Sequence, residues 1–284
     1  MEIEIVGSGG AFVTPRPGCH CAMCDEARAK GVPYARRGPS VFVHGPDILF
    51  DTPEDIAVSL NESGIDRVRA CFYSHWHPDH VMGRRVFEQM NWNLRDSSGN
   101  YGVTDIYIPE RVEKDMQTKL ATRAHLDYLR ALGLVTITVI PEGESVEIEG
   151  VTITPFQVAV EYVYAYLLQG DGKRVLVAMD ELFRWSAPDF LHGVDLAVIP
   201  SGVCEYHPLT GERRIEAGHP ILELEMHLEE TLELVRTMAA KQAVLMHIDE
   251  VDGISYDDGM ELSRSYMAEG LPVAFGWDGM RTTV

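Results

Sequence analysis

The 284-residue sequence has little positive charge: 24 Lys and Arg residues stand against 44 Asp and Glu residues, for a formal net charge of -20. Proteins that grip nucleic-acid phosphates usually carry a basic patch. The basic stretches here are short, such as "ARRG" at residues 35–38. We therefore expect no nucleic-acid partner, and the acidic excess favours solubility and a small-molecule substrate.

The sequence also has no run of about eighteen apolar residues, so we expect no transmembrane helix and no membrane partner. Its first ten residues, "MEIEIVGSGG", carry acidic side chains where a signal peptide would carry positive charge. These features predict a cytoplasmic protein. They leave open whether the chain forms a homo-oligomer.

Cysteine is scarce and odd in number, with five residues in the whole chain. An odd count in a long chain without a signal peptide argues against a disulfide framework. Three of the five lie in "GCHCAMC", as Cys19, Cys21 and Cys24. The CxCxxC spacing lets three thiolates reach one tetrahedral zinc ion. We predict a structural zinc site here, the alternative being three free thiols in a surface loop.

No low-complexity linker and no short repeat divides the chain, and strand patterns with interspersed helices occur in both halves. This predicts one α/β domain over residues 1–284, built on two sheets. Within it we expect a Cys-rich loop at about 18–39 and a mainly helical insertion at about 84–133. Several apolar strands end in an ionisable residue, which places side chains along one rigid edge. These residues are Asp51, His75, Asp180 and His247.

The segment "SHWHPDH" at residues 74–80 holds the densest group of metal-ligand side chains. His75 and His77 alternate along an extended segment and point the same way, so they can bind one ion. After the proline turn, Asp79 and His80 face a second position. With the following glycine they form the string HxHxDHxxG. Two ions about 3.5–4 Å apart can clamp both ends of a displacement reaction. The alternative is a solvated histidine-rich loop.

Two later strand ends supply further candidate ligands. Asp180 ends "RVLVAMD", and a carboxylate there can bridge two ions through its two oxygens. His247 ends "AVLMH" and can complete one coordination sphere. Aspartate is also common in caps and turns, so each position alone is weak evidence. Asp51, which ends "DILFD", is better placed to orient a ligand than to bind the metal.

With these motifs the chain resembles the metallo-β-lactamase fold superfamily. The CxCxxC loop, together with "ARAKG" and "RRGPS", resembles the branch that contains the cyclic-phosphate phosphodiesterase of the carbon–phosphorus lyase pathway. The resemblance runs from "GSGGA" to "FGWDGM". It implies an αββα sandwich of two mixed β-sheets flanked by helices, with a site for two ions, usually Zn²⁺ or Mn²⁺. It implies one ion on His75 and His77, the other on Asp79, His80 and His247, and Asp180 bridging them.

The resemblance also implies catalytic side chains beside the ions. Asp79 or Asp180 would orient the attacking hydroxide. A histidine would protonate or stabilise the phosphate or the leaving group, and "MHLEETLELV" matches the place of that histidine, which makes His227 the candidate. His219, in "AGHPI", is the second choice. The alternative for both is a surface histidine.

The sequence departs from the family pattern at two positions. A histidine that normally serves the first ion is missing, and Ala159 or Val160 stands in its place. Glu161 is the nearest residue that could replace it, the alternative being an exposed acid. In the cysteine site, Glu250 of "HIDE" stands where the branch has a histidine ligand. A Cys3Glu site is one solution, and His20 or His44 could serve instead.

The sequence therefore predicts a metal-dependent hydrolase, most simply a phosphodiesterase for a small phosphate ester or a cyclic phosphate. One alternative is a ligand- or metal-binding protein with weak or no turnover, because the third histidine is missing. Another is a thioester, lactone or amide hydrolase on the same fold, since specificity lies in variable loops. We expect the loop between Arg84 and Tyr101, with Trp92, to form a pocket wall.

Overall fold

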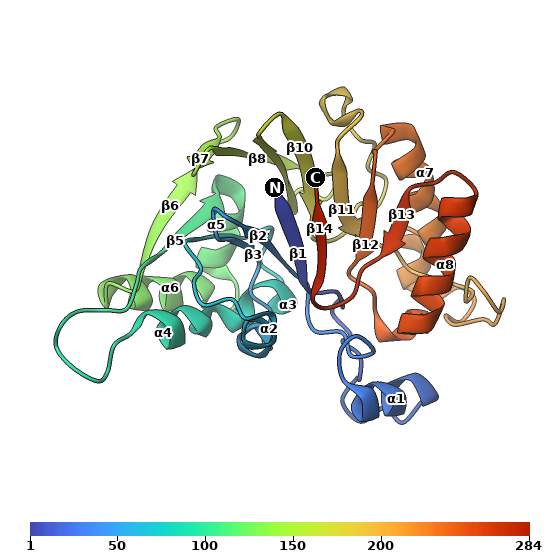
Figure 1. Cartoon of the computed structure of the whole chain (residues 1–284), viewed down its shortest axis with the longest axis horizontal. Coiled ribbons are helices and arrows are strands. Elements are labelled where there is room, and N and C mark those ends of the chain that lie inside the picture. Colours follow the sequence, from blue (N-terminus) through green and yellow to red (C-terminus); the bar gives the residue numbers. More distant parts are fainter.

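The computed structural model describes residues 1–284 and consists of two seven-stranded sheets that pack face to face (Figure 1). The first sheet has the order β14-β1-β2-β3-β4-β5-β6, and the second has the order β13-β12-β11-β10-β9-β8-β7. The strands of the first sheet are β1 (Glu2–Gly7), β2 (Ser40–His44), β3 (Ile48–Phe50), β4 (Ala70–Phe72), β5 (Thr104–Pro109), β6 (Val135–Ile140) and β14 (Met280–Thr283). Those of the second are β7 (Val146–Ile148), β8 (Val151–Gln157), β9 (Tyr164–Gly170), β10 (Lys173–Ala178), β11 (Leu196–Pro200), β12 (Ala243–Met246) and β13 (Val273–Phe275).

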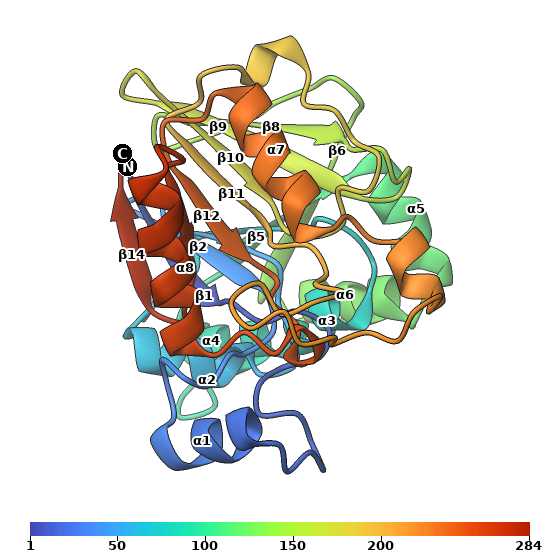
Figure 2. The ribbon, with the colours of Figure 1, turned by 90° about the vertical axis from the view of Figure 1, so that its right-hand side faces the viewer.

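Helices cover the outer face of each sheet, and α7 and α8 lie over the second (Figure 2). The α-helices are α1 (Ala22–Lys30), α2 (Ile56–Ser63), α3 (Pro78–Val81), α4 (Val86–Asn91), α5 (Glu110–Thr118), α6 (Thr122–Ala131), α7 (Leu228–Met238) and α8 (Tyr256–Ala268). Short 3-10 turns lie at Met82–Arg85, Asp189–Leu191, Pro220–Glu223 and Glu250–Asp252. None of the helices combines the length and the apolar character that a membrane span requires.

Three apolar layers hold these elements together. The middle layer lies between the sheets, where Phe50 and Phe72 of the first sheet pack against Tyr166 of the second. One outer layer packs helices against the first sheet, and the other packs α7 and α8 against the second. The alternation of inward and outward side chains explains why each strand serves two layers. The expected αββα sandwich is confirmed.

Both sheets are mixed, and this places the polar strand ends together. In the first sheet β3, β4, β5 and β6 are parallel neighbours, and in the second β10, β11, β12 and β13 are. The carboxyl ends of parallel strands share one edge, which is where α/β sheets commonly bind ligands. Asp51, His75, Asp180 and His247 follow β3, β4, β10 and β12 at this edge.

The N-terminal region differs from the expected loop, because α1 spans Ala22–Lys30 within it. The Cys21 thiol accepts a hydrogen bond from the backbone N–H of Cys24 and caps the helix. Asp25 in the first turn and Arg28 in the last complement the helix dipole. The same segment therefore carries both the metal-ligand spacing of the cysteines and the cap and charge pattern of a helix. Residues 84–133 hold three α-helices around β5.

Candidate metal centre

Six side chains from three separate strand ends, those of β4, β10 and β12, converge at the shared edge of the two sheets. They form two adjoining groups, and we name the whole set the histidine–aspartate cluster. The groups are His75, His77 and Asp180, and Asp79, His80 and His247. Within each group the potential ligand atoms lie within 4.8 Å of one another. The structure thus brings together every histidine and aspartate that the sequence predicted as a ligand of the two ions.

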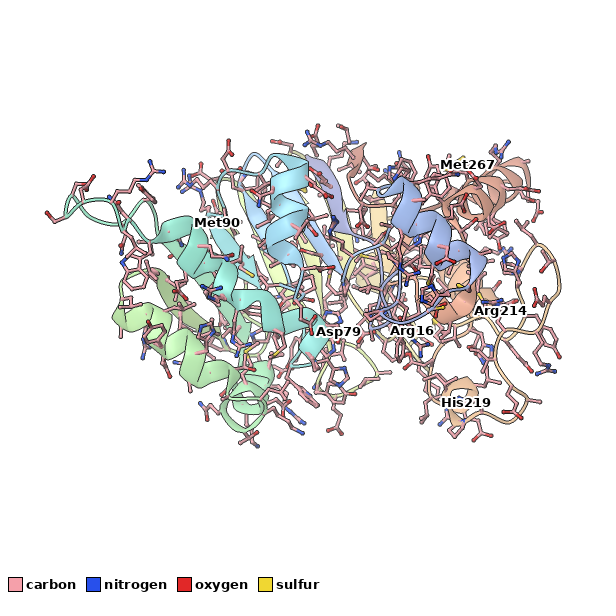
Figure 3. The ribbon with its side chains drawn as sticks, turned by 90° about the horizontal axis from the view of Figure 1, so that it is seen from below. Arg16, Asp79, Met90, Arg214, His219 and Met267 are labelled. Carbon is pink, nitrogen blue, oxygen red and sulfur yellow. The ribbon has the colours of Figure 1, made fainter.

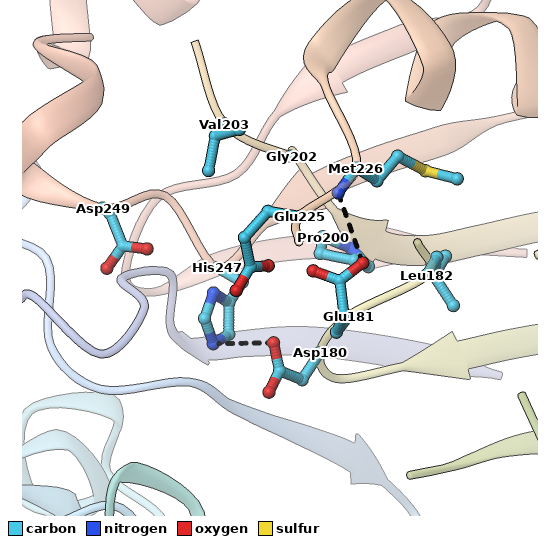
Figure 4. Close-up of a pocket in the computed structure, with 10 residues that line it drawn as sticks. All are labelled: Asp180, Glu181, Leu182, Pro200, Gly202, Val203, Glu225, Met226, His247 and Asp249. Atoms are coloured by element: carbon cyan, nitrogen blue, oxygen red, sulfur yellow. Dashed lines mark hydrogen bonds and ion pairs between the residues drawn. The ribbon is translucent and has the colours of Figure 1, made fainter. Parts of the chain in front are cut away.

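Asp180 lies between the two groups. Its Oδ2 is 3.1 Å from His75 Nε2 and 3.7 Å from His80 Nε2. Its Oδ1 is 3.3 Å from His247 Nε2, a contact that Figure 4 shows. In the second group, Asp79 Oδ2 is 3.3 Å from His80 Nε2 and 3.6 Å from His247 Nε2. A carboxylate in this central position can serve both groups at once, which is the geometry of a bridging ligand.

The donor atoms of this cluster fit metal ions. The Nε2 atoms of His75, His80 and His247 are buried, and although carboxylate oxygens lie nearby, none of the three makes a hydrogen bond of acceptable geometry. Buried polar atoms normally have one, so an orphaned atom indicates a missing ion, water or ligand. Three imidazole nitrogens that converge on carboxylates form a donor set suited to Zn²⁺ or Mn²⁺. The residues present therefore fit a pair of divalent ions.

Asp51 holds two of these histidines in the tautomer that a metal ligand needs. It is fully buried and accepts hydrogen bonds from His80 Nδ1 at 2.7 Å, from the Ser74 backbone N–H at 2.8 Å and from Ser74 Oγ at 2.5 Å. Ser74 Oγ in turn lies 3.0 Å from Nδ1 of His75 and accepts a hydrogen bond from it. Since both Nδ1 atoms carry hydrogen, both Nε2 lone pairs face the cluster. This supports the orienting role predicted for Asp51.

Backbone geometry at the cluster is tightly constrained. Asp51 and His247 have positive φ angles of 61° and 55°, a conformation rare for residues with side chains and frequent at functional sites. A Cβ at Gly83, the glycine of HxHxDHxxG, would lie 1.8 Å from the Pro53 carbonyl oxygen. A Cβ at Gly10 would lie 2.6 Å from His247 Nδ1. Only glycine fits at these two close approaches.

Burial and neighbouring charge shift the pKa values of the cluster in opposite directions. Burial, with the nearby His75, lowers the pKa of His77 to about 4. Burial also opposes charge on His247, yet the carboxylates of Asp180, Asp79 and Asp249 together raise its pKa to about 10. The imidazoles hold the pKa of Asp180 well below its usual range despite burial. Cations are therefore favoured among these carboxylates, and protons compete with metal there.

Glu161 does not join the first group, so the expectation that it replaces the missing histidine is wrong in this structure. Its side chain is 82% exposed, and its carboxylate lies 3.6 Å from the guanidinium of Arg111. The turn between β8 and β9 directs it outward, and the Gln157 side chain donates to its backbone carbonyl. Tyr162 lies beside the histidines instead, with its ring centroid 5.3 Å from that of His77.

A second site, which we name the cysteine cluster, consists of Cys19, Cys21, Cys24 and Glu250. Glu250 Oε1 lies 3.3, 3.4 and 3.7 Å from the three sulfur atoms in that order. The structure therefore selects Glu250 as the fourth member. His20 faces Asp25, and His44 contacts Glu4 on the far side of β2. Burial raises the pKa of the Cys24 thiol to about 12, so bound metal would have to displace its proton.

A large cavity of about 930 Å³ opens beside the histidine–aspartate cluster, and His77, Asp79, Asp180 and His247 form part of its wall. The remaining walls come from residues 11–12, 160–163, 181–183, 203–225 and 249–251. The loop with Trp92 does not contribute, which corrects the expectation for residues 84–101. Trp92 packs against the core beneath the first sheet.

His227 also lies apart from this cavity. It precedes α7, and its Nε2 lies 3.0 Å from the Leu222 carbonyl oxygen and donates to it. This contact closes the loop before the helix, so the histidine has a structural partner. The predicted catalytic role of His227 is therefore not supported, whereas the second choice, His219, lies in the cavity wall. Figure 3 labels His219 in the C-terminal half of the molecule.

Sequence reasoning missed four acids in the wall, Glu181, Glu216, Glu225 and Asp249. Figure 4 shows Glu181 and Glu225 beside Asp180 and His247. Burial, together with the charge of Asp180, raises the pKa of Glu225 to about 7. Glu181 accepts a hydrogen bond from the Met226 backbone N–H, 3.3 Å away. Glu181 directly follows the predicted ligand Asp180, which is a signal that could have found it. Glu225 lies in a loop of mixed composition with no such signal.

Comparison with known proteins places the chain in a family. The family described as "Beta-lactamase superfamily domain" matches residues 47–248. This match covers well over half of the chain, so the protein belongs to the beta-lactamase superfamily. The match contains the whole histidine–aspartate cluster, and it leaves out all four members of the cysteine cluster.

Solved structures share the fold over the whole chain. A new diphosphatase from the PhnP family has a TM-score of 0.70 at 21% identity, covering 100% of this chain and 97% of that one. Zn²⁺-bound PqqB from Methylobacterium extorquens has a TM-score of 0.72 at 16% identity, covering 100% of both chains. Human tRNase Z, short form, has a TM-score of 0.64 at 16% identity, covering 100% and 99%. At these identities the similarity establishes the fold.

One curated relative matches a shorter stretch. An octanoyltransferase from Porphyromonas gingivalis (strain ATCC BAA-308 / W83) is 30% identical over 96 residues, which is 33% of this chain. The match covers 19% of that protein, so the chain spans a small part of the length of this relative.

Proposed function

We propose that this beta-lactamase superfamily protein is a metal-dependent hydrolase that acts on a small phosphate ester as a phosphodiesterase. The observation that carries the proposal is the set of three buried, unpartnered Nε2 atoms of His75, His80 and His247 around the Asp180 carboxylate. Such a set is costly to bury unless it binds cations. It lies in the wall of a cavity that a substrate can enter.

Divalent ions, Zn²⁺ or Mn²⁺, bound at the two groups would supply Lewis acidity. They would also lower the pKa of a water molecule, so that hydroxide is present at neutral pH. His75 and His77 would hold one ion, His80 and His247 the other, with Asp79 serving the second and Asp180 serving both. Side chains of the protein itself orient these ligands and place charge at the site.

The chain contributes orientation and charge at this site. Asp51 orients His80 directly and orients His75 through the Ser74 hydroxyl. The two imidazoles therefore need no reorganisation when the substrate binds. Asp79 stays ionised at neutral pH, because His80 and His247 hold its pKa far below neutrality despite burial, so its carboxylate can accept a hydrogen bond from an attacking water and orient it. His219, the second choice for a proton donor, lines the same cavity but lies on the side away from the cluster.

A phosphodiester agrees with two further observations. The two groups of side chains lie next to each other, so two ions held there would both be within reach of one phosphate. Paired ions of this kind are used in phosphate-ester hydrolysis. One of the structures with the same fold is a diphosphatase of the PhnP family. A carboxylic ester or thioester presents one carbonyl oxygen and makes less use of two ions.

The test combines metal analysis with turnover. We expect the protein purified without added metal to hold transition metal, and to hydrolyse bis(p-nitrophenyl) phosphate faster than p-nitrophenyl acetate. Chelation should abolish the hydrolysis, and Zn²⁺ or Mn²⁺ should restore it. His75→Gln should reduce it at least about a hundredfold, whereas His192→Gln, at an exposed position outside the site, should not change it. A folded, metal-loaded protein without phosphodiester turnover would overturn the proposal.

A further inference from the structure

The cavity beside the histidine–aspartate cluster is lined mainly by apolar side chains. Eleven of its 21 lining residues are hydrophobic. Among them are Phe12, Val160, Phe183, Ile215, Ile221 and Leu224. A cavity of about 930 Å³ is at the large end for a small-molecule site and exceeds what a phosphate alone would occupy.

Apolar side chains also face solvent along this wall. Phe12 is 49% exposed and Leu224 is 61% exposed, on two segments that are far apart in the sequence. Exposed apolar side chains that gather at one hollow mark a binding surface more often than isolated ones do. Along the apolar part of the wall a hydroxyl group would lose its hydrogen bonds to water without replacement, so that part favours a hydrocarbon chain or ring. Polar partners outside the cluster are confined to the rest of the lining, where Glu181, Glu216, Glu225 and Asp249 lie with Arg214 and His219.

One cationic side chain interrupts this apolar lining. Arg214 is the only Lys or Arg among the lining residues. Its guanidinium has no carboxylate within ion-pair distance, and its single contact is Nε to the Val251 carbonyl oxygen at 3.4 Å. The neighbouring Arg213, in contrast, pairs with the Glu205 carboxylate and the Tyr206 hydroxyl. Arg214 is therefore free to bind an anion that enters the cavity.

The backbone makes room for the guanidinium of Arg214. Gly253 has a positive φ of 75°, and a Cβ there would lie 2.5 Å from Nε of Arg214. The Arg214 backbone N–H donates to the Glu205 carbonyl, which fixes the start of the side chain. Figure 3 shows Asp79 near the middle of the molecule, with Arg214 and His219 on the side of the C-terminal half. Arg214 thus lies away from the cluster, at another part of the same cavity.

We propose that the cavity takes an amphipathic substrate: the ester group reacts at the histidine–aspartate cluster, an apolar chain or ring lies along the hydrophobic wall, and a distal anionic group binds Arg214. The proposal rests on the proposed function, since the cluster supplies the reacting end. It names the class of substrate as a phosphate ester of an apolar alcohol that carries a second negative charge, such as a carboxylate.

Binding of phosphonates, which cannot be hydrolysed as phosphate esters can, separates the three parts of the ligand. Isothermal titration of the metal-loaded protein should give a Kd for octylphosphonic acid at least tenfold lower than that for methylphosphonic acid, because each methylene moved from water to an apolar wall contributes up to about fourfold. Phosphonocarboxylic acids of increasing chain length should bind more tightly still once the carboxylate reaches Arg214.

Arg214→Gln tests the anionic end. It should weaken binding of the best phosphonocarboxylic acid at least fivefold and leave octylphosphonic acid within twofold, while Arg214→Lys should retain part of the gain. Arg213→Gln is the matched control and should change neither ligand. Equal binding of octyl and methyl phosphonates would overturn the apolar part of the proposal. Equal binding of the phosphonocarboxylic acid to the native protein and to Arg214→Gln would overturn the assignment of Arg214.

Turnover separates this inference from the proposed function. The octyl and methyl esters of p-nitrophenyl phosphate release the same leaving group, and we expect a kcat/KM at least tenfold higher for the octyl ester. Equal turnover of both esters would overturn the inference and leave the phosphodiesterase in place. If neither ester is hydrolysed while the ranking of the phosphonates holds, the proposed function fails and the ligand class stands.

Discussion

The histidine–aspartate cluster and the cysteine cluster are both candidate metal sites, but they are built in different ways. The first draws its members from three strand ends, and buried side chains such as Asp51, at a fourth strand end, hold them from behind. The second takes three of its four members from the loop and first turn before and within α1, and the fourth, Glu250, from the other end of the chain.

The partners available to each cluster differ accordingly. The imidazoles of His75 and His80 are oriented by Ser74 and Asp51, so their geometry does not depend on a bound ion. In the cysteine cluster the thiols contact one another and Glu250, while Arg16 lies 3.5 Å from the other carboxylate oxygen. An ion at the first site would find a preformed scaffold, whereas an ion at the second would connect a peripheral segment to the body of the protein.

A short backbone connection links the two sites. The Phe12 N–H donates to Asp249 Oδ1 at 2.7 Å, and the Glu250 N–H donates to the Phe12 carbonyl at 2.8 Å. In the sequence, only two residues separate His247 of the first site from Glu250 of the second. Although the two sites are close in the chain, they differ in rigidity, since the sheets support one site and a loop supports the other.

The largest expected effect comes from removing the support behind the histidine–aspartate cluster. In Asp51→Asn, one acceptor oxygen becomes an N–H₂ group that cannot accept from His80 or Ser74. We expect metal affinity at this cluster and kcat/KM to fall about 10- to 100-fold, as for other residues that orient metal ligands. Zinc at the cysteine cluster should be unaffected.

Asp47→Asn is the matched control for this change. Asp47 also has a positive φ, 55°, but lies in the turn between β2 and β3. It should alter neither metal content nor turnover, which would be measured by elemental analysis and steady-state kinetics. If Asp51→Asn behaves as Asp47→Asn does, the preformed scaffold is not what positions the imidazoles.

The next largest effect should appear at the cysteine cluster, as lost stability. Cys21→Ser removes a thiolate and the helix cap of α1. Because metal binding contributes directly to folding, we expect unfolding to become easier by about 2–3 kcal/mol, or about 5–10 °C in Tm for a chain of this size. Calorimetry and zinc analysis would measure it, with Met23→Leu in the same segment as the control. Unchanged Tm and zinc content would show that the cysteines do not bind metal.

A smaller effect tests the seam that holds the N-terminal segment to the body of the protein. Asp278 is buried, and it accepts hydrogen bonds from Ser8 and from the Arg37 backbone N–H. Burial raises its pKa to about 6 in spite of these contacts. The folded state therefore binds this proton more tightly than the unfolded chain, whose aspartates titrate near pH 4.

The contribution of this group to folding is fully present below about pH 4 and is lost as the pH rises through about 6. Asp278→Asn cannot lose a proton, so the stability of the native protein relative to this variant should fall by roughly 2 kcal/mol between pH 4 and pH 7. Urea unfolding at several pH values would measure the difference. A difference that does not vary with pH would mean that the pKa of Asp278 is the same in the folded and unfolded states.

The sequence predicted the parts of this protein that follow from local pattern. Apolar strands that end in Asp or His indicated which candidate ligands would meet at one edge, because the backbone of the strand fixes where its last residue lies. Asp180 and His247 were found in this way, although 66 residues separate them. Glu250 was found because it lies at a fixed spacing after His247.

The parts that the sequence did not predict depend on how loops pack. Arg214 and Glu225 face the cavity only because the segment 203–225 folds over the strand ends, and no periodicity marks such a loop. His227 matched a motif, but the Leu222 carbonyl binds its imidazole. A one-dimensional pattern cannot show such a competing hydrogen bond.

The smallest expected effect concerns the first group of the histidine–aspartate cluster, His75, His77 and Asp180, which lacks a fourth side-chain ligand. If Glu161 were that ligand, Glu161→Ala would empty this group. Its exposed carboxylate instead pairs with Arg111, and exposed ion pairs contribute at most about 1 kcal/mol. We therefore expect metal content and kcat/KM of Glu161→Ala to equal those of the native protein, with Arg111→Ala as the paired control. A metal loss in Glu161→Ala but not in Arg111→Ala would show that the turn between β8 and β9 moves Glu161 into the site when metal binds. In that case the first group would, like the cysteine cluster, be completed by a segment that the ion itself holds in place.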